Sequence, residues 1–143
     1  IASMSSLNKD AADTLKQFNP SAVTDISGFG LLGHLKEICE NSNATARIDF
    51  SKLKFLPGTR ALAGSDIIPG GTRRNYDYIK DFCEFNSTLS PLDHLLAADA
   101  QTSGGLLITL NEHEAKKFIH SYNKDSAIIG VVERRGKNLI KVI

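Results

Sequence analysis

Three polar residues, Thr24, Asp25 and Ser27, border glycines spaced as G-x-G-x-x-G at positions 28, 30 and 33. This glycine pattern can open a dinucleotide-binding loop, in which a pyrophosphate meets the N-terminus of a helix. A carboxylate at the same place could instead hold Mg²⁺, which prefers carboxylate oxygens and shares them with substrate phosphates. A third interpretation is structural: the glycines permit tight turns, and Asp25 caps the following helix.

The segment before the glycines argues against the dinucleotide interpretation. A dinucleotide loop needs a buried strand before it and an acidic residue about 20 positions after it. Asp49 lies near that distance, but N-P-S-A-V-T at 19–24 carries proline and polar residues. A central parallel strand would instead be continuously apolar. A helix cap and a metal ligand remain open for Asp25, and local chemistry alone favours the cap.

The hydrophobic pattern predicts a single α+β domain, with helices packed on one mixed β-sheet. Asn8 is expected to cap the first helix, and Asn111 with Glu114 the last, while Ser90 and Pro91 start another. The turn R-R-G-K-N is expected to join the last two strands as a hairpin. Helices are expected over 9–18, from the glycines to 41, and over 57–63, 76–82, 91–98 and 112–122; strands over 21–24, 44–50, 106–110, 127–133 and 139–143; and a glycine-rich loop over 67–75.

Composition indicates one globular domain of 143 residues, 41% hydrophobic and with a net charge of +1. We expect no nucleic-acid partner, because the arginine pairs at 73–74 and 134–135 are short enough to be solvated turns. We also expect no membrane span, and a cytoplasmic protein in which Cys39 and Cys83 are reduced thiols. The chain starts at Ile1 without an initiator methionine, which favours a fragment or a processed piece.

Four segments resemble motifs of the selenophosphate synthetases and occur in the same order as in that family. They are T-D-I-S-G-F-G-L-L-G-H-L at 24–35, I-P-G-G-T-R-R-N at 68–75, D-A-Q-T-S-G-G-L-L-I at 99–108 and I-I-G-V-V at 128–132. The resemblance implies that residues 1–143 form the C-terminal domain, whose plan is shared with aminoimidazole ribonucleotide synthetase and thiamine-monophosphate kinase. The resemblance also implies an N-terminal domain of the same protein, outside this sequence, that binds ATP and carries the catalytic cysteine or selenocysteine and lysine.

The resemblance also implies a reaction: selenide, ATP and water give selenophosphate, AMP and phosphate, with Mg²⁺ as cofactor. No catalytic residue is then expected in this segment, which should be inactive alone. Asp25 matches an aspartate that reaches across the domain interface to Mg²⁺ and phosphate, as a hard carboxylate ligand can. A homodimer is expected for the full-length protein, mainly through the missing domain.

Several residues are expected to support the Asp25 loop. Thr24 and Ser27 could act through their hydroxyls, while Gly28, Phe29 and Gly30 shape the loop and the helix start. A second group, for which a buried turn network and direct ligand contact are comparably plausible, consists of Asn75, Gln101, Thr102, Ser103, Gly104 and Gly105. For the histidines we expect a packing role for His34 and surface positions for His94, His113 and His120.

Two residues depart from the family pattern. Ala100 replaces a proline, which loosens the turn, and Ser27 replaces threonine but keeps a hydroxyl. Two rival functions remain open: a related ATP-dependent enzyme acting on another substrate, as aminoimidazole ribonucleotide synthetase or thiamine-monophosphate kinase does, or a non-catalytic binding module. The binding module would show no dependence on Asp25.

Overall fold

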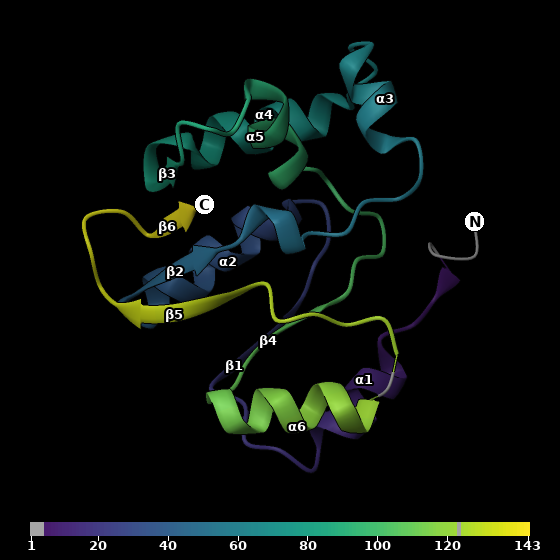
Figure 1. Cartoon of the computed structure of the whole chain (residues 1–143), viewed down its shortest axis with the longest axis vertical. Helices are drawn as coiled ribbons and strands as arrows, with labels where there is room; N and C mark the ends of the chain where they lie inside the picture. The colour runs from purple at the N-terminus through teal and green to yellow at the C-terminus, as the bar shows by residue number, and fades with distance from the viewer. Residues whose placement is uncertain (1–4, 123) are drawn as a thin grey trace.

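The computed structural model describes residues 5–122 and 124–143 as an α+β domain of two β-sheets and six α-helices. Figure 1 shows α3, α4 and α5 together at the top, α2 with strands β2, β5 and β6 in the middle, and α1 with α6 at the bottom. The predicted α+β class is confirmed. The strands, however, divide between two sheets rather than forming one.

The larger sheet has four strands in the order β3-β6-β2-β5. Its central strands are β2 (Ala44–Ile48) and β6 (Ile140–Val142), which run parallel to each other. β5 (Gly130–Arg134) pairs antiparallel with β2 at one edge, and β3 (Cys83–Phe85) pairs parallel with β6 at the other. The strand β3 was not predicted, since only three residues form it and no alternating pattern extends beyond them.

The predicted hairpin between the last two strands is wrong, because β2 lies between β5 and β6. Burial explains the order. Ile140 and Val142 of β6 are fully buried and therefore need an interior position, whereas Val131 and Val132 of β5 are about half exposed and suit an edge. The segment that connects β5 to β6 is hydrogen-bonded to β2. The Thr45 hydroxyl donates to the Asn138 carbonyl and accepts from the Gly136 N–H.

Helix α2 (Gly30–Asn41) packs on this sheet with the apolar stripe that the sequence predicted. Leu32, Leu35 and Cys39 are buried in the main core, with Leu31 and Ile38 packed against it. α4 (Gly70–Ile79) and α5 (Pro91–Ala97) cover the other side of α2. α5 starts as predicted, because Ser90 and Asp93 form a reciprocal capping box.

The glycine-rich loop predicted over 67–75 is wrong, since α4 begins at Gly70 directly after Pro69. Thr72, Asn75 and Ile79 are all buried, and spacings of three and four residues place them on one helix face. Burial of these three side chains therefore stabilises the helix, although it begins with two glycines, which have a low helix propensity. Consequently the Arg73–Arg74 pair lies on a helix, not in a turn, and the helix predicted over 76–82 starts earlier and ends in a 3₁₀ turn, Lys80–Phe82.

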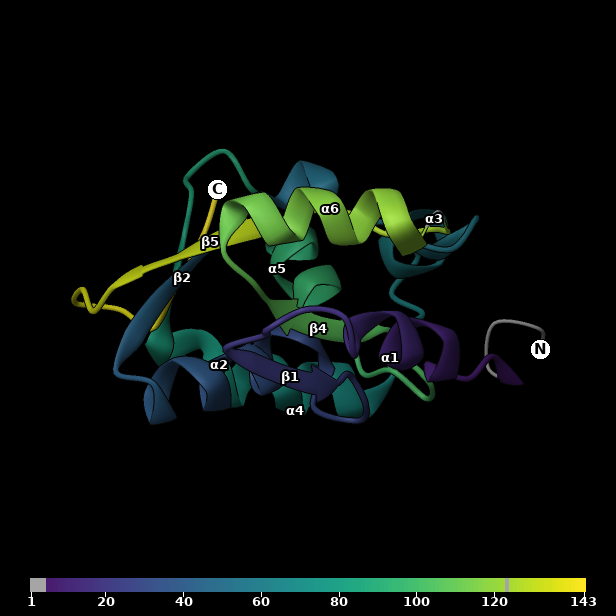
Figure 2. The ribbon, with the colours of Figure 1, turned by 90° about the horizontal axis from the view of Figure 1, so that it is seen from below.

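The second sheet is a two-stranded antiparallel ribbon of β1 (Ala22–Asp25) and β4 (Leu106–Thr109). Figure 2 shows it beside α1 (Lys9–Leu15) and α6 (Glu112–Tyr122). The helices and the ribbon share a small core of their own, formed by Ala11, Leu15, Phe18, Leu106, Ile108, Leu110, Phe118 and Tyr122. Among the described residues β1 pairs with β4 alone, and this pairing is antiparallel. The G-x-G-x-x-G therefore does not lie in a parallel βαβ unit, and the dinucleotide interpretation is excluded.

Smaller differences concern helix ends. The first helix ends at Leu15, before the expected Phe18, and the Asn8 side chain makes no cap; its amide donates instead to the Gly104 carbonyl. α3 (Thr59–Gly64) begins after Pro57, because Gly58 adopts a left-handed conformation, φ +86°, at the helix boundary. At the start of α6, Asn111 caps the Glu114 N–H as predicted.

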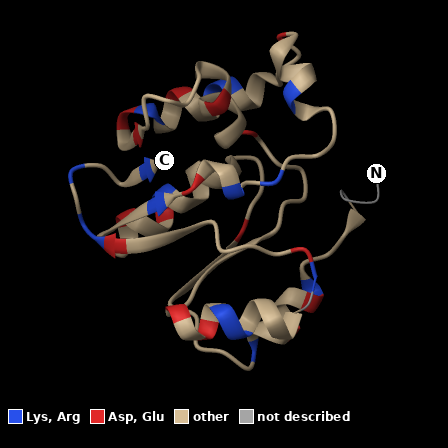
Figure 3. Ribbon diagram, in the orientation of Figure 1, with Lys and Arg blue, Asp and Glu red and all other residues tan. Residues whose placement is uncertain are grey.

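Positively and negatively charged residues are interspersed along the described part of the chain (Figure 3). Within that part no helix is long and apolar enough to cross a bilayer.

Both cysteines should react slowly with thiol reagents in the folded chain. Burial raises the pKa of Cys39, and it raises the pKa of Cys83 to about 12, so little reactive thiolate forms at neutral pH. We expect colorimetric thiol titration to detect two thiols quickly in denaturant and slowly in buffer. Release of two equivalents within mixing time in buffer would contradict this.

Candidate functional site

Asp25 is the last residue of β1, opposite Leu106 of β4, and its side chain is exposed. The carboxylate makes no hydrogen bond or ion pair with any residue that the structure describes. It also does not cap α2, whose N-cap is Phe29 and lacks a side-chain bond. Two apolar neighbours are exposed as well, Val23 by 42% and Phe29 by 58%. Asp25 and these two apolar side chains, which lie within seven residues of each other in the sequence, are therefore all accessible at the surface.

The two hydroxyls expected to support Asp25 bond elsewhere. The Thr24 hydroxyl lies 3.2 Å from the Asp25 backbone carbonyl, not its carboxylate. Ser27 is held by His34: its backbone N–H donates to His34 Nε2 at 3.2 Å, and its hydroxyl lies 3.1 Å from the same nitrogen. His34 therefore fastens the loop after Asp25, which agrees with a packing role for this histidine.

Gly30 starts α2 with a left-handed conformation, φ +68°. A Cβ atom there would lie 2.4 Å from the Asp99 carbonyl oxygen and 2.9 Å from that of Ala98. Both observations require glycine, since side chains rarely adopt this φ and the contact is with backbone. The second glycine of the motif thus allows the Asp25 loop to lie against residues 98 and 99.

The predicted Gln101–Gly105 segment runs beside the Asp25 loop. The Gln101 and Gly104 N–H groups donate to the carbonyls of Ser27 and Ile26, and the Ile26 N–H donates to the Gly105 carbonyl. A Cβ on Gly104 would lie 2.7 Å from the Ile26 oxygen. The other contacts of this segment include a hydrogen bond from the Ser103 hydroxyl to Ser6, and Thr102 is exposed. These contacts are those of a turn network.

Helix α4 joins both loops through two side chains on one face. Asn75 donates to the carbonyls of Gly28, at 2.9 Å, and Ala98, at 3.2 Å. The Thr72 hydroxyl donates to the Asp99 carboxylate at 2.5 Å and accepts from the Ala100 N–H at 3.3 Å. Thr72 and Asp99 were not singled out from the sequence, although the three-residue spacing of Thr72 and Asn75 could have indicated a shared helix face.

A metal ion would need more ligands than the described residues bring together. Among the described residues no three His, Cys, Asp or Glu side chains are grouped so that they could hold one. Asp25 offers one exposed hard oxygen donor, which fits a shared Mg²⁺ site and not a complete one, because Mg²⁺ takes only one or two carboxylates beside waters and phosphates.

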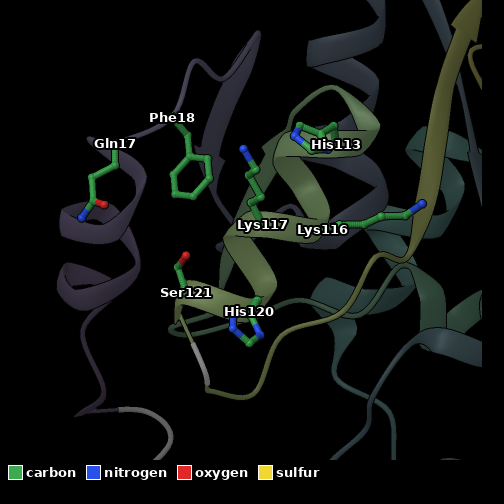
Figure 4. A pocket seen from close by; sticks show the side chains of 7 residues that line it. All are labelled: Gln17, Phe18, His113, Lys116, Lys117, His120 and Ser121. Atoms are coloured by element: carbon green, nitrogen blue, oxygen red, sulfur yellow. The ribbon is translucent and has the colours of Figure 1, made fainter.

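Two shallow cavities lie away from Asp25. One, of about 500 Å³, lies between α1 and α6, where Phe18 points into the space between the helices and Lys116 points away from it (Figure 4). The other, of about 540 Å³, lies between α3, α4 and α5 and is lined mainly by apolar side chains, with Thr72 and Asp99 at its edge. Asp25 lines neither of these two cavities.

His94 was expected at the surface, but the structure places it partly inside. Its ring stacks on Phe85, with 4.0 Å between centroids, because α5 packs against this aromatic side chain. Its Nε2 atom is buried without a hydrogen-bond partner among the described residues. Burial lowers the pKa of His94, against an opposing effect of Asp93 and of a backbone hydrogen bond to Leu89.

The stability of the chain should therefore fall as the pH drops through the histidine range. The unfolded chain takes up a proton near the ordinary pKa of 6.5, while folded His94 resists it, so protonation favours unfolding. The loss of stability caused by His94 is absent well above pH 6.5 and complete below the lowered pKa of His94 in the folded chain. We expect the urea midpoint to fall between about pH 7.5 and about pH 5, and His94→Phe to reduce this fall. An equal fall in the variant would contradict the assignment.

The chain belongs to the family of AIR synthase related proteins, as their C-terminal domain, because the family model matches residues 6–143. Its relatives are named selenide, water dikinase. The protein of Aliarcobacter butzleri is 40% identical over 142 residues, which cover 96% of this chain and 41% of the relative. That of Carboxydothermus hydrogenoformans is 33% identical with the same coverage. That of a Sulfurovum species is 36% identical over all of this chain and 42% of the relative.

The chain thus spans about two-fifths of the length of these relatives. Together with the match to a C-terminal domain, this agrees with a domain of a larger protein.

Proposed function

We propose that residues 1–143 are the C-terminal domain of a selenide, water dikinase. In the whole protein, ATP, selenide and water would give selenophosphate, AMP and phosphate. The observation that carries this proposal is the identity of 33–40% to proteins of that name over 96% of the chain. An N-terminal domain would supply the nucleophile, the ATP site and most metal ligands, and this chain alone would be inactive.

The role of this domain is to supply one Mg²⁺ ligand, Asp25. The carboxylate at the end of β1 supports this role, because it is exposed and bonds no residue that the structure describes. The exposed Val23 and Phe29, which the N-terminal domain would cover, support it as well. When bound, Mg²⁺ neutralises phosphate charge and orients the phosphates for displacement. The residues of this chain hold the loop: Ser27 through His34, and Gly28 through Asn75.

The reaction can be tested with the full-length protein that contains this chain. Incubated without oxygen with ATP and Mg²⁺, it should form AMP only when selenide is added, and phosphorus NMR should detect selenophosphate in equal amount. ATP turnover without selenide, driven instead by thiamine monophosphate or by an aminoimidazole ribonucleotide precursor, would overturn the proposal and favour a related enzyme. No turnover with any of these substrates would favour a binding module.

A further inference from the structure

Asn75 is the point at which three separate segments of the chain meet. It lies on α4, is only 8% exposed, and its amide nitrogen donates to the carbonyls of Gly28 and Ala98. An asparagine amide carries two hydrogens, so both donors are used. One side chain thus connects the loop that follows Asp25 to the segment that follows α5.

The position of Gly28 makes this contact important for Asp25. The backbone bonds to the 101–105 segment hold Ile26 and Ser27, and α2 begins at Gly30. Gly28 lies between these two fixed regions. A metal ligand must be held to within about 0.5 Å of its working position by the residues around it. A hydrogen bond from a buried side chain on a helix meets this need, since the packed helix cannot move independently.

We propose that Asn75 is a positioning residue for the Asp25 carboxylate, and not a ligand of substrate or metal. Its two donors are occupied by backbone carbonyls, and the side chain is buried under the loop. Thr72, on the same face of α4, holds the neighbouring Asp99 and Ala100. Helix α4 therefore supports both loops through these two side chains. The inference rests on the proposed function of Asp25 as a metal ligand.

The chain offers a matched control for a mutation at Asn75. Thr45 is fully buried, and it also makes two hydrogen bonds to backbone groups, each of 2.8 Å, but in the four-stranded sheet. Asn75→Ala and Thr45→Ala each remove two hydrogen bonds between a buried side chain and backbone groups, so both variants should lose stability. Only Asn75→Ala should alter the metal site.

The test is a titration of the full-length protein with Mn²⁺ in the presence of ATP, followed by electron paramagnetic resonance. We expect Asn75→Ala to weaken Mn²⁺ binding roughly tenfold, as loss of a supporting contact commonly does, and Thr45→Ala to leave it unchanged. In an Asp25→Asn background the effect of Asn75→Ala should disappear. Hydrogen exchange at residues 26–29 should be faster in Asn75→Ala than in Thr45→Ala. If Asn75→Ala does not fold, Asn75→Ser, too short to reach both carbonyls, replaces it.

The outcomes separate the two proposals. If Asp25→Asn weakens Mn²⁺ binding but Asn75→Ala and Asn75→Ser only lower the melting temperature, Asn75 is not a positioning residue and the proposed function stands. If Asp25→Asn leaves Mn²⁺ binding unchanged, the metal role of Asp25 fails and the inference about Asn75 fails with it.

Discussion

Replacing Asp25 with asparagine in the full-length protein is expected to lower selenide-dependent formation of AMP about a hundredfold, because a metal ligand contributes several kcal/mol to stabilising charge in the transition state. The remaining activity should need more Mg²⁺, since an amide oxygen binds this cation more weakly than a carboxylate. The melting temperature should not change, because the carboxylate is exposed and bonds no described residue. The assay measures AMP across a Mg²⁺ titration.

Asp77→Asn provides the control for charge. Asp77 is an exposed carboxylate on α4 that pairs with Lys80, the first residue of the 3₁₀ turn after this helix. This variant should retain normal activity and Mg²⁺ dependence. Normal behaviour of Asp25→Asn as well would mean that Asp25 is not a metal ligand.

Gly30→Ala is expected to be the most destabilising single methyl addition in the loop. The new Cβ would meet the Asp99 carbonyl oxygen at 2.4 Å, and the residue would have to keep φ +68°. The backbone strain and the overlap together should cost about 3 kcal/mol. Urea unfolding of the 143-residue chain measures this loss.

Gly28→Ala is the matched substitution two positions earlier. A Cβ on Gly28 meets nothing within 4 Å, and its φ is not in the left-handed region. The free energy of unfolding of Gly28→Ala should stay within about 0.5 kcal/mol of that of the parent chain. Equal stability losses in the two variants would contradict the packing of Gly30 against residues 98 and 99.

Local patterns in the sequence predicted the elements in which the key residues recur at a regular spacing. The stripe on α2 and the capping box at Ser90 are examples, because each depends on residues three or four positions apart. The order of strands could not be predicted in this way. A turn sequence such as R-R-G-K-N is compatible with a hairpin, and only the burial of Ile140 and Val142 against distant helices places β6 inside the sheet.

The candidate site was predictable in part for similar reasons. The polar cluster and glycines at 24–33 identified the loop, and the resemblance to selenophosphate synthetases suggested the role of Asp25. The helical state of 70–75 was hidden by two glycines and a proline, which usually mark loops. The hydrogen-bond partners of Thr72 and Asn75, which are Asp99 and Gly28, are also distant in sequence. The support that these two side chains give to the loops could therefore not be recognised.

The most direct test of the metal role is a crystal structure of the full-length protein with Mg²⁺ and a non-hydrolysable ATP analogue. We predict an oxygen of the Asp25 carboxylate at about 2.1 Å from a Mg²⁺ ion that also contacts phosphate oxygens. An ordered nucleotide and metal with Asp25 outside the coordination sphere, in solvent or bonded to protein, would contradict it.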